Sequence, residues 1–348
     1  MSSSEGKEAN VLLIGSGGVG TIVAYGIDYV GKSRLDIVVR RDYDQVSKNG
    51  YDIDSCDYGQ ISNWKPTNIY PSADAAAEEA NASGLKYDFI VICTKNLPDV
   101  LKLEDVVAPL VTDEYTTIVL MQNGFDLARP FFAKFPKNVV VSGVSHIGSH
   151  NHNGKVKQTQ QDRTYIAYFE NPNLDHEIQE RNTKRFISIY SNDRNSCGYY
   201  PSAKENRYMK LVYNATMNTV CALTGVDTGR LEYSGGLEKI SIPAMREVVA
   251  VAKADGVDLP ADCISNAIHS DDGDWFTPSM AVDVQKGNPI ELEVIVGNLL
   301  TVARELNVET PTLNLLYELL KVVQFRLKEK QGLVSLPEKR PIHDKFWC

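Results

Sequence analysis

Three polar residues, Lys210, Asn214 and Asn218, follow one another at intervals of four in a segment otherwise rich in Leu, Val, Met and Tyr. On a helix these positions share one face and span about 12 Å at a rise of about 1.5 Å per residue. Apolar surroundings place that face near the interior, where partial loss of hydration makes a lysine ammonium a better proton donor. The two amides could hold a carbonyl or a hydroxyl. The alternative is a polar surface stripe, or asparagines that bond to neighbouring backbone.

A carboxylate that could pair with this lysine stands at Glu291, just before a nearly continuous apolar run. A buried carboxylate needs a partner, and a buried lysine would provide one. Glu293 lies two residues further on, and the pattern alone does not separate the two acids. Upstream, the segment Thr277-Pro278-Ser279-Met280 indicates the start of another helix.

A glycine-rich segment follows the apolar run of residues 11–14 and precedes an apolar helical stretch at 21–29. It has the GxGxxG pattern of a dinucleotide-binding turn, in which phosphate lies on the free N–H groups at the start of the helix. The alternative is a strand-to-helix turn that binds nothing. The residues of this segment are Gly15, Ser16, Gly17, Gly18, Val19 and Gly20.

Charged and polar residues stand where three expected strands end. Arg40, followed by Arg41 and Asp42, ends the second strand, and guanidinium groups there suit a ribose 2′-phosphate. This favours NADPH over NADH, although Arg41 could equally be a solvated charge. Lys95 and Asn123 follow the next two strands and could line the remainder of the cofactor. Asn123 precedes a glycine, so a simple turn is the alternative there.

Short, continuously apolar runs alternate with helical or polar stretches in the first half of the chain, a pattern typical of a parallel sheet covered on both faces. Beyond residue 203 apolar residues recur at helical spacing up to residue 327. We therefore expect an α/β domain over 1–200, a helical domain over 201–334 and a loosely packed tail over 335–348. The expected strands are 11–14, 35–39, 89–93, 117–121 and 138–141, with edge strands at 164–168 and 198–200.

Composition excludes several functional classes. The 348 residues carry a formal charge of −9, which argues against nucleic acid or anionic lipid as a partner. Six cysteines without a CxxC pair indicate free thiols in a reducing compartment, and the polar residues 1–10 do not read as a targeting segment. We expect a cytoplasmic protein without membrane spans. His146, His150 and His152 lie in or beside a polar loop at 149–154 that lacks a matching ligand cluster, so no metal site is expected.

Together these motifs resemble the ketopantoate reductase family from Val11 to about Leu327. The resemblance implies a Rossmann-type NADP-binding domain followed by an all-helical domain like the C-terminal domain of 6-phosphogluconate dehydrogenase. It also implies hydride transfer to a ketone in a cleft between the domains, with Lys210 as general acid and Glu291 near the lysine and the cofactor. The remaining implied roles are substrate binding by Asn214, Asn218 and Ser279, and cofactor contacts by Asn123 and the backbone of Ile147.

The resemblance implies NADPH-dependent reduction of 2-dehydropantoate to pantoate, a step toward coenzyme A. Thr228 stands where a further substrate-binding asparagine is expected, and residues 59–85 include extra material. The alternatives are therefore a reductase for another branched or aromatic 2-oxo acid, or a non-catalytic NADP(H)-binding regulator. Helical domains of such enzymes can dimerise, so a homodimer is one expected assembly.

Overall fold

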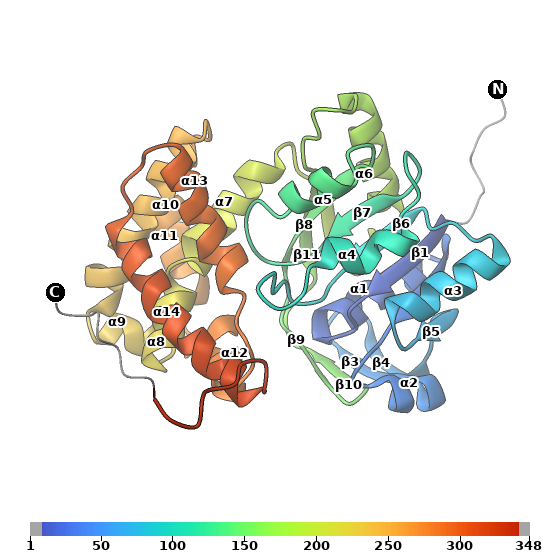
Figure 1. Ribbon diagram of the computed structural model, residues 1–348, viewed down its shortest axis with the longest axis horizontal. Helices are drawn as coiled ribbons and strands as arrows, with labels where there is room; N and C mark the ends of the chain where they lie inside the picture. Colours follow the sequence, from blue (N-terminus) through green and yellow to red (C-terminus); the bar gives the residue numbers. More distant parts are fainter. Residues whose placement is uncertain (1–8, 341–348) are drawn as a thin grey trace. The chain divides into compact units, whose positions relative to one another are not determined.

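The computed structural model describes residues 9–340, which form two compact units (Figure 1). The first unit ends at Lys210 and the second begins at Leu211, so the division falls inside helix α7 (Ala203–Asn214). The expectations for residues 1–8 and for the end of the tail, residues 341–348, lie outside the described residues. Within residues 9–340 no helix is both long and apolar enough to cross a bilayer.

An eight-stranded sheet forms the centre of the first unit, in the order β12-β11-β8-β7-β6-β1-β2-β5. The six strands from β8 to β5 are parallel, whereas β11 runs antiparallel to β8. The central strands are buried along nearly their whole length, as their continuously apolar sequences predict. The strands are β1 (Ala9–Ile14), β2 (Ser33–Val38), β5 (Asn68–Tyr70), β6 (Phe89–Ile92), β7 (Thr117–Leu120), β8 (Val140–His146), β11 (Arg163–Tyr168) and β12 (Ser196–Tyr199). The predicted α/β class is confirmed.

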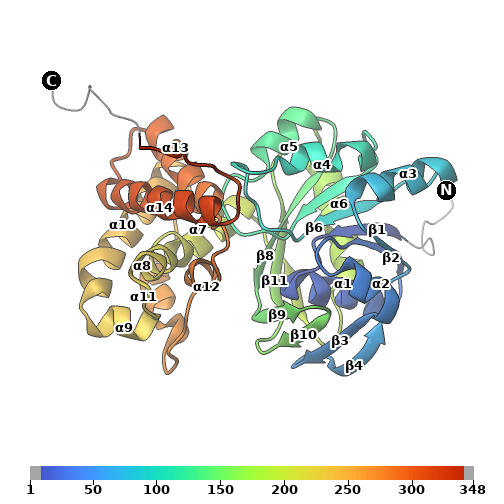
Figure 2. The same ribbon diagram turned by 60° about the horizontal axis from the view of Figure 1, so that its bottom comes forward.

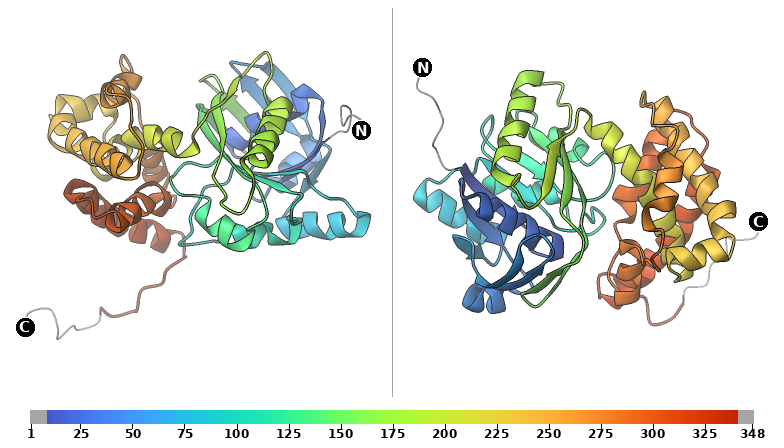
Figure 3. Two further views of the ribbon diagram at one scale, coloured as in Figure 1. Left: turned by 90° about the horizontal axis from the view of Figure 1, so that it is seen from above. Right: turned by 180° about the vertical axis from the view of Figure 1, so that it is seen from behind.

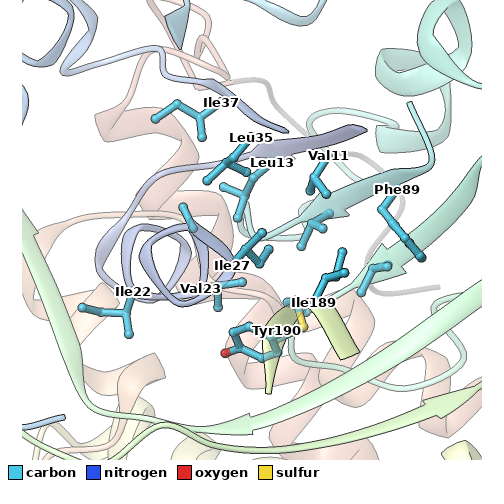
Figure 4. Close-up of a cluster of buried hydrophobic side chains, with 14 of the residues drawn as sticks. Val11, Leu13, Ile22, Val23, Ile27, Leu35, Ile37, Phe89, Ile189 and Tyr190 are labelled. Atoms are coloured by element: carbon cyan, nitrogen blue, oxygen red, sulfur yellow. The ribbon is translucent and has the colours of Figure 1, made fainter. Parts of the chain in front are cut away.

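Helices cover both faces of this sheet, with α1 and α6 on one side and α3, α4 and α5 on the other (Figure 3, left). Ile22, Val23 and Ile27 of α1 point at the strands, and Tyr190 of α6 closes the same apolar layer (Figure 4). Helix α1 ends at Gly31, whose left-handed φ of 70° suits a residue without a side chain. The helices are α1 (Gly18–Val30), α2 (Tyr43–Asn49), α3 (Ala73–Ser83), α4 (Leu103–Val107), η1 (Ala108–Leu110), α5 (Arg129–Lys134) and α6 (His176–Tyr190).

A second, four-stranded sheet replaces the polar loop expected at 149–154, and that expectation was wrong. Its order is β4-β3-β10-β9, with β9 and β10 joined as a hairpin (Figure 2). Asn153 and Gly154 both have positive φ, 51° and 83°, as a two-residue hairpin turn requires. The sheet lies against α1 and includes part of the extra material after residue 59. The strands are β3 (Tyr51–Ser55), β4 (Gly59–Trp64), β9 (Ser149–His152) and β10 (Lys155–Gln158).

A buried arginine joins the start of α7 to the ends of two strands. Arg207 is only 3% exposed, and its Nη1 donates to the carbonyls of Gln122 at 2.7 Å and Gly124 at 2.9 Å. Its Nε donates to Ser142 Oγ at 2.8 Å. Nη2 reaches two further carbonyls, at Leu120 (3.1 Å) and Gly143 (3.4 Å). This side chain therefore holds α7 against β7, β8 and the turn that follows β7.

The second unit is helical, as expected from the periodicity beyond residue 203 (Figure 1). Helix α8 packs against α12 and α14, while α10 packs against α13 and α14. Left-handed glycines end α8 at Gly225 and α12 at Gly287. The elements are α8 (Met217–Thr224), α9 (Thr228–Tyr233), η2 (Leu237–Ser241), α10 (Ile242–Ala254), α11 (Cys263–Ile268), η3 (His269–Asp271), α12 (Ser279–Lys286), η4 (Glu293–Gly297), α13 (Asn298–Glu305) and α14 (Pro311–Lys330).

Replacing Arg207 should destabilise the protein strongly. The substitution Arg207→Met keeps much of the apolar stem but leaves several buried acceptors without their donor, each costing about 1–3 kcal/mol. We expect the free energy of unfolding to fall by about 3 kcal/mol or more. The measurement is urea denaturation, followed by a spectroscopic signal that reports unfolding of the first unit. Arg181→Met, at an exposed position of α6, is the matched control and should change stability little. Equal midpoints for the two variants would contradict this role.

Candidate dinucleotide and substrate site

The glycine-rich turn between β1 and α1 is shaped by close backbone contacts. Gly15 has a φ of +100°, and a Cβ there would lie 2.5 Å from the backbone nitrogen of Thr94. A Cβ on Gly20 would lie 1.9 Å from the carbonyl oxygen of Gly15. Larger residues would therefore break both the turn and the contact between helix and strand.

Gly17 differs from its neighbours because a Cβ there would meet no described atom within 4 Å. No side chain caps the first turn of α1, which starts directly after Gly17. Open space beside uncapped N–H groups at a helix start is what a pyrophosphate needs. The turn thus has the open space and the uncapped N–H groups that a dinucleotide needs, and the contacts of residues Gly15 to Gly20 with a cofactor stay a prediction.

Strand β9 supports the other side of this turn, a contact that the sequence did not predict. A Cβ on Gly18 would lie 2.3 Å from the carbonyl oxygen of Ser149. Asn151 Nδ2 donates to the Ser16 carbonyl at 2.9 Å and to Asp42 Oδ2 at 3.1 Å. Asn151 therefore ties the glycine turn to the segment after β2, where Arg40 and Arg41 are both exposed.

Polar groups gather at the carboxyl ends of β6, β7 and β8. Gln122 Nε2 donates to the Thr94 carbonyl at 2.6 Å, which joins the segments after β6 and β7. Among residues 9–340, Gln122 Oε1, Ser145 Oγ and Ser149 Oγ are buried without a hydrogen-bond partner. Such orphaned atoms are costly unless a ligand or water satisfies them, so this edge has the chemistry to receive ribose hydroxyls and an amide.

The predicted cofactor residues lie along this same edge. Lys95 is exposed in the segment after β6, and Asn123 is partly buried after β7. Ile147, expected to offer its backbone, comes directly after β8 and is partly buried. Their contacts with a cofactor stay predictions.

Lys210 is partly buried and belongs to the same edge of the first unit. Its Nζ donates to the Ser145 carbonyl near the end of β8, at 2.6 Å. Arg207 stands three residues earlier on α7, so the side chains of Arg207 and Lys210 both bond to the strand ends. Crowding by protein atoms, together with the positive charges of Lys210 and Arg163, lowers the pKa of His146 to about 4. The imidazole is therefore neutral at pH 7 and adds no charge beside the ammonium.

The expectation that Lys210, Asn214 and Asn218 lie on one regular helix was wrong, because α7 ends at Asn214 and α8 begins at Met217. Thr216 between them has φ −122° and ψ −76°. Its hydroxyl donates to the Val212 carbonyl at 2.6 Å. Threonine hydroxyls that bond to carbonyls one turn back compete with the helical ladder and bend it. Lys210 and Asn214 remain one turn apart on α7, whereas Asn218 starts from a new helix.

In the second unit, Asn218 and Ser279 lie on helices that pack together, α8 and α12. Asn218 is 2% exposed, and its Oδ1 has no hydrogen-bond partner among the described residues. Ser279 is the exposed first residue of α12, where the uncapped helix start favours a carboxylate. These features suit the predicted substrate roles, which no contact with a substrate yet tests.

Thr228 bonds to the protein itself. Its backbone nitrogen donates to the Phe276 carbonyl at 3.0 Å, and its hydroxyl donates to the same oxygen at 3.3 Å. It lines a cavity of about 280 Å³ beside the stacked rings of Tyr233 and Trp275. The lining of the cavity also includes four acidic residues, Glu232, Asp271, Asp272 and Asp274.

The sequence pattern did not distinguish Glu291 from Glu293, and the contact with Tyr317 gives Glu293 a structural role. The Tyr317 hydroxyl donates to both carboxylate oxygens of Glu293, at 3.1 and 2.9 Å. Glu293 therefore joins its own segment, η4, to helix α14. Glu291, two residues earlier and partly buried, precedes the helical segment. Its predicted place beside Lys210 joins residues of separate units and stays a prediction.

No group of three His, Cys, Asp or Glu side chains within residues 9–340 is arranged as a metal site would need. Sequence reasoning did not single out Arg207 or Asn151, since an arginine in a helix or an asparagine in a polar segment carries no distinctive spacing. Only a predicted β9 beside the glycine turn could have pointed to Asn151.

Comparisons with known proteins agree with this geometry. The model "Ketopantoate reductase PanE/ApbA" matches residues 11–171, and "Ketopantoate reductase PanE/ApbA C terminal" matches residues 202–324. An uncharacterized protein of Saccharomyces cerevisiae is 38% identical over 95% of this chain and 98% of its own length. A 2-dehydropantoate 2-reductase of Nostoc sp. is 24% identical over 94% of this chain and 99% of its own.

Among solved structures, 2-dehydropantoate 2-reductase from Methylococcus capsulatus has a TM-score of 0.76 and 28% identity. The match covers 91% of this chain and 97% of that one. The two family models together span both units, from the first strand to helix α14. The chain therefore belongs to the ketopantoate reductase family, whose members are NADP-dependent oxidoreductases.

Proposed function

We propose that the protein reduces a 2-oxo acid to the corresponding 2-hydroxy acid with NADPH, and that the acid is 2-dehydropantoate, a precursor of pantothenate and coenzyme A. The observation that carries this proposal is the position of Lys210. Its ammonium is fixed by the Ser145 carbonyl at the sheet edge that also bears the glycine turn and the orphaned polar atoms. A proton donor and a dinucleotide cradle on one edge suit reduction of a carbonyl.

The bound cofactor supplies a hydride to the ketone carbon, and the chain supplies the proton. In this proposal Lys210 donates a hydrogen bond to the ketone oxygen and then transfers its proton as the carbon–oxygen double bond becomes an alcohol. Asn214 and Asn218 orient the substrate, and Ser279 at the start of α12 binds its carboxylate. Glu291 holds the lysine side chain in position. The same site could serve the reverse oxidation.

A reductase for another 2-oxo acid is the second candidate, and Thr228 favours it. A substrate-binding asparagine is expected at this position, but Thr228 has a hydroxyl instead of an amide. That hydroxyl already donates to the Phe276 carbonyl.

We also propose a reducing, cytoplasmic compartment. The five described cysteines are free thiols. Burial, with a smaller effect of Asp162, raises the pKa of Cys197 to about 12, so that this thiol is unreactive at neutral pH. Such cysteines suit a protein that does not rely on disulfides.

A panel of 2-oxo acids tests the function directly. The purified protein is mixed with NADPH and each acid, and the loss of reduced-nicotinamide absorbance is followed. We expect rapid oxidation with 2-dehydropantoate, and a preference for a bulkier acid would favour the second candidate. NADPH binding without turnover on any acid would instead indicate a non-catalytic regulator and overturn the proposal.

The substitution Lys210→Met should lower kcat by about 100-fold to 10,000-fold, because the proton donor is removed. NADPH affinity, measured by quenching of tryptophan fluorescence, should change little. Lys204→Met, an exposed position on the same helix, serves as the control and should keep its turnover. Equal kcat values for the two variants would remove Lys210 as the general acid.

The substitution Arg40→Ala should weaken NADPH binding by about 10-fold to 100-fold through loss of a charge-assisted phosphate contact. NADH binding should stay within about twofold, since NADH has no 2′-phosphate. Arg41→Ala is the matched neighbour, and comparison of their dissociation constants shows which guanidinium reads the phosphate. A parallel loss of NADH affinity in Arg40→Ala would contradict this assignment.

A further inference from the structure

The segment that carries Glu291 is bound on both sides of that residue by side chains of helix α14. On one side, Gln324 binds the backbone of Ile290: its Oε1 accepts from the Ile290 nitrogen at 2.9 Å, and its Nε2 donates to the Ile290 carbonyl at 3.0 Å. On the other side, the Tyr317 hydroxyl donates to both carboxylate oxygens of Glu293. Glu291 therefore lies between two points of the chain that α14 fixes.

The contact between Gln324 and Ile290 is buried, and it satisfies both polar groups of a backbone that has no regular structure. Gln324 is 5% exposed, and Ile290 is wholly buried. Residues 288–291 belong to no helix or strand, so the N–H and C=O groups of Ile290 need partners from elsewhere. The Gln324 amide supplies one donor and one acceptor. Its loss would leave two buried backbone groups unsatisfied.

Tyr317 fixes the helical segment that follows Glu291. Burial, and then the Glu293 carboxylate, raises the pKa of the Tyr317 hydroxyl, so this group stays a donor at neutral pH. A Cβ on Gly297 would lie 2.6 Å from Glu293 Oε2, so this glycine leaves the space that the carboxylate occupies. The segment η4 is a π-helix, a rare form that is frequent at functional sites. The bond from Tyr317 therefore holds a wide helical turn that begins two residues after Glu291.

The two side chains of α14 act from one face of that helix. Tyr317 and Gln324 are seven residues apart, which is about 20° short of two turns and about 10.5 Å along the axis. Leu320 lies between them and is wholly buried, so this stretch of the helix is packed into the core of the helical unit. The supports on the two sides of Glu291 therefore come from a single packed element.

We propose that Tyr317 and Gln324 are positioning residues of the reductase, which hold the carboxylate of Glu291 in the direction that the reaction needs. This inference rests on the proposed function, in which Glu291 holds the Lys210 side chain. The Glu291 carbonyl also accepts from the Ile295 nitrogen at 3.1 Å, so its backbone is fixed and only its side-chain torsions stay free. A misplacement of about 1 Å near the reacting groups can cost about 100-fold in rate.

Turnover separates positioning from stability. Measured on the 2-oxo acid that the native protein reduces fastest, Tyr317→Phe should lower kcat about 10-fold to 100-fold, because the bond to Glu293 is lost. NADPH affinity should change less than about twofold, since the glycine turn belongs to the first unit. Glu247→Gln is the matched control, because Glu247 accepts from the backbone nitrogens of Thr312 and Leu313 at the start of the same helix. It should lower the urea midpoint as Tyr317→Phe does, yet keep its kcat.

Combination with Glu291→Gln shows whether Tyr317 acts through Glu291. Glu291→Gln alone should lower kcat, and the double variant with Tyr317→Phe should be no slower than Glu291→Gln. Losses that multiply, or a Tyr317→Phe variant as fast as the control, would overturn the inference and leave the proposed function standing. An unchanged kcat in Glu291→Gln would instead overturn the role of Glu291 itself, and the inference with it.

The variant Gln324→Glu tests the second support through pH. An ionised carboxylate still accepts from the Ile290 nitrogen but cannot donate to the Ile290 carbonyl, whereas the protonated acid restores both bonds. Burial raises the pKa of a carboxyl group, so the acid regains its proton within an accessible pH range. The kcat of this variant relative to the native protein should rise as the pH falls from about 8 to about 5. The same ratio for Glu247→Gln should stay flat, and a flat ratio for Gln324→Glu would overturn the role of Gln324.

Hydrogen exchange detects the two supports without any turnover. The amides of residues 288–298 should exchange about tenfold faster in Tyr317→Phe, and in Gln324→Glu at about pH 8, than in the native chain, because local opening no longer breaks these bonds. In Glu247→Gln the same amides should keep their native rates. Native exchange rates in all three variants would overturn the inference, whichever acid the protein reduces.

Discussion

The guanidinium of Arg207 is the interaction on which the arrangement of the first unit's site depends. Its three nitrogens donate to groups on β7, on β8 and in the turn after β7. A lysine could not replace it, because the planar fork directs donors to several carbonyls at once. Since Arg207 fixes α7 at this point, the side chain of Lys210, one turn later, is restricted to positions near the Ser145 carbonyl, to which it donates a hydrogen bond. The proposed proton donor is therefore placed by the residue that holds the strand ends.

The glycine turn between β1 and α1 depends on the absence of a side chain at its glycine positions. Gly15, Gly18 and Gly20 each lie so close to neighbouring backbone that a methyl group would clash, whereas Gly17 faces open space. The first three glycines build the turn, and the fourth leaves room for the ligand. Strand β9 is part of this construction, because it contacts Gly18 and carries Asn151. The small second sheet is thus a support for the glycine turn.

The strands of the main sheet and the glycine turn could be predicted because continuous apolar runs and glycine spacing are local signals. Strand β9 could not, since its sequence Ser149-His150-Asn151-His152 is entirely polar and one of its faces is exposed. The Asn153-Gly154 turn that joins it to β10 is a local hairpin signal, but no alternating apolar pattern precedes that turn to identify a strand. The break after Asn214 depends on the hydrogen bond from the Thr216 hydroxyl to the Val212 carbonyl, which helical periodicity does not reveal. Arg207 has a role only through tertiary contacts, so no spacing marks it.

The pair Arg40 and Asp42 shows how the structure bears on cofactor choice. An acid after the second strand ordinarily binds the ribose 2′-hydroxyl of NADH, so Asp42 taken alone would favour that cofactor. Here the carboxylate of Asp42 accepts a hydrogen bond from Asn151, whose amide also bonds to the Ser16 carbonyl. Asp42 is thereby linked to the glycine turn through Asn151. The exposed guanidinium groups of Arg40 and Arg41 lie in the same segment, so Asp42 is compatible with the proposed contact between an arginine and a 2′-phosphate.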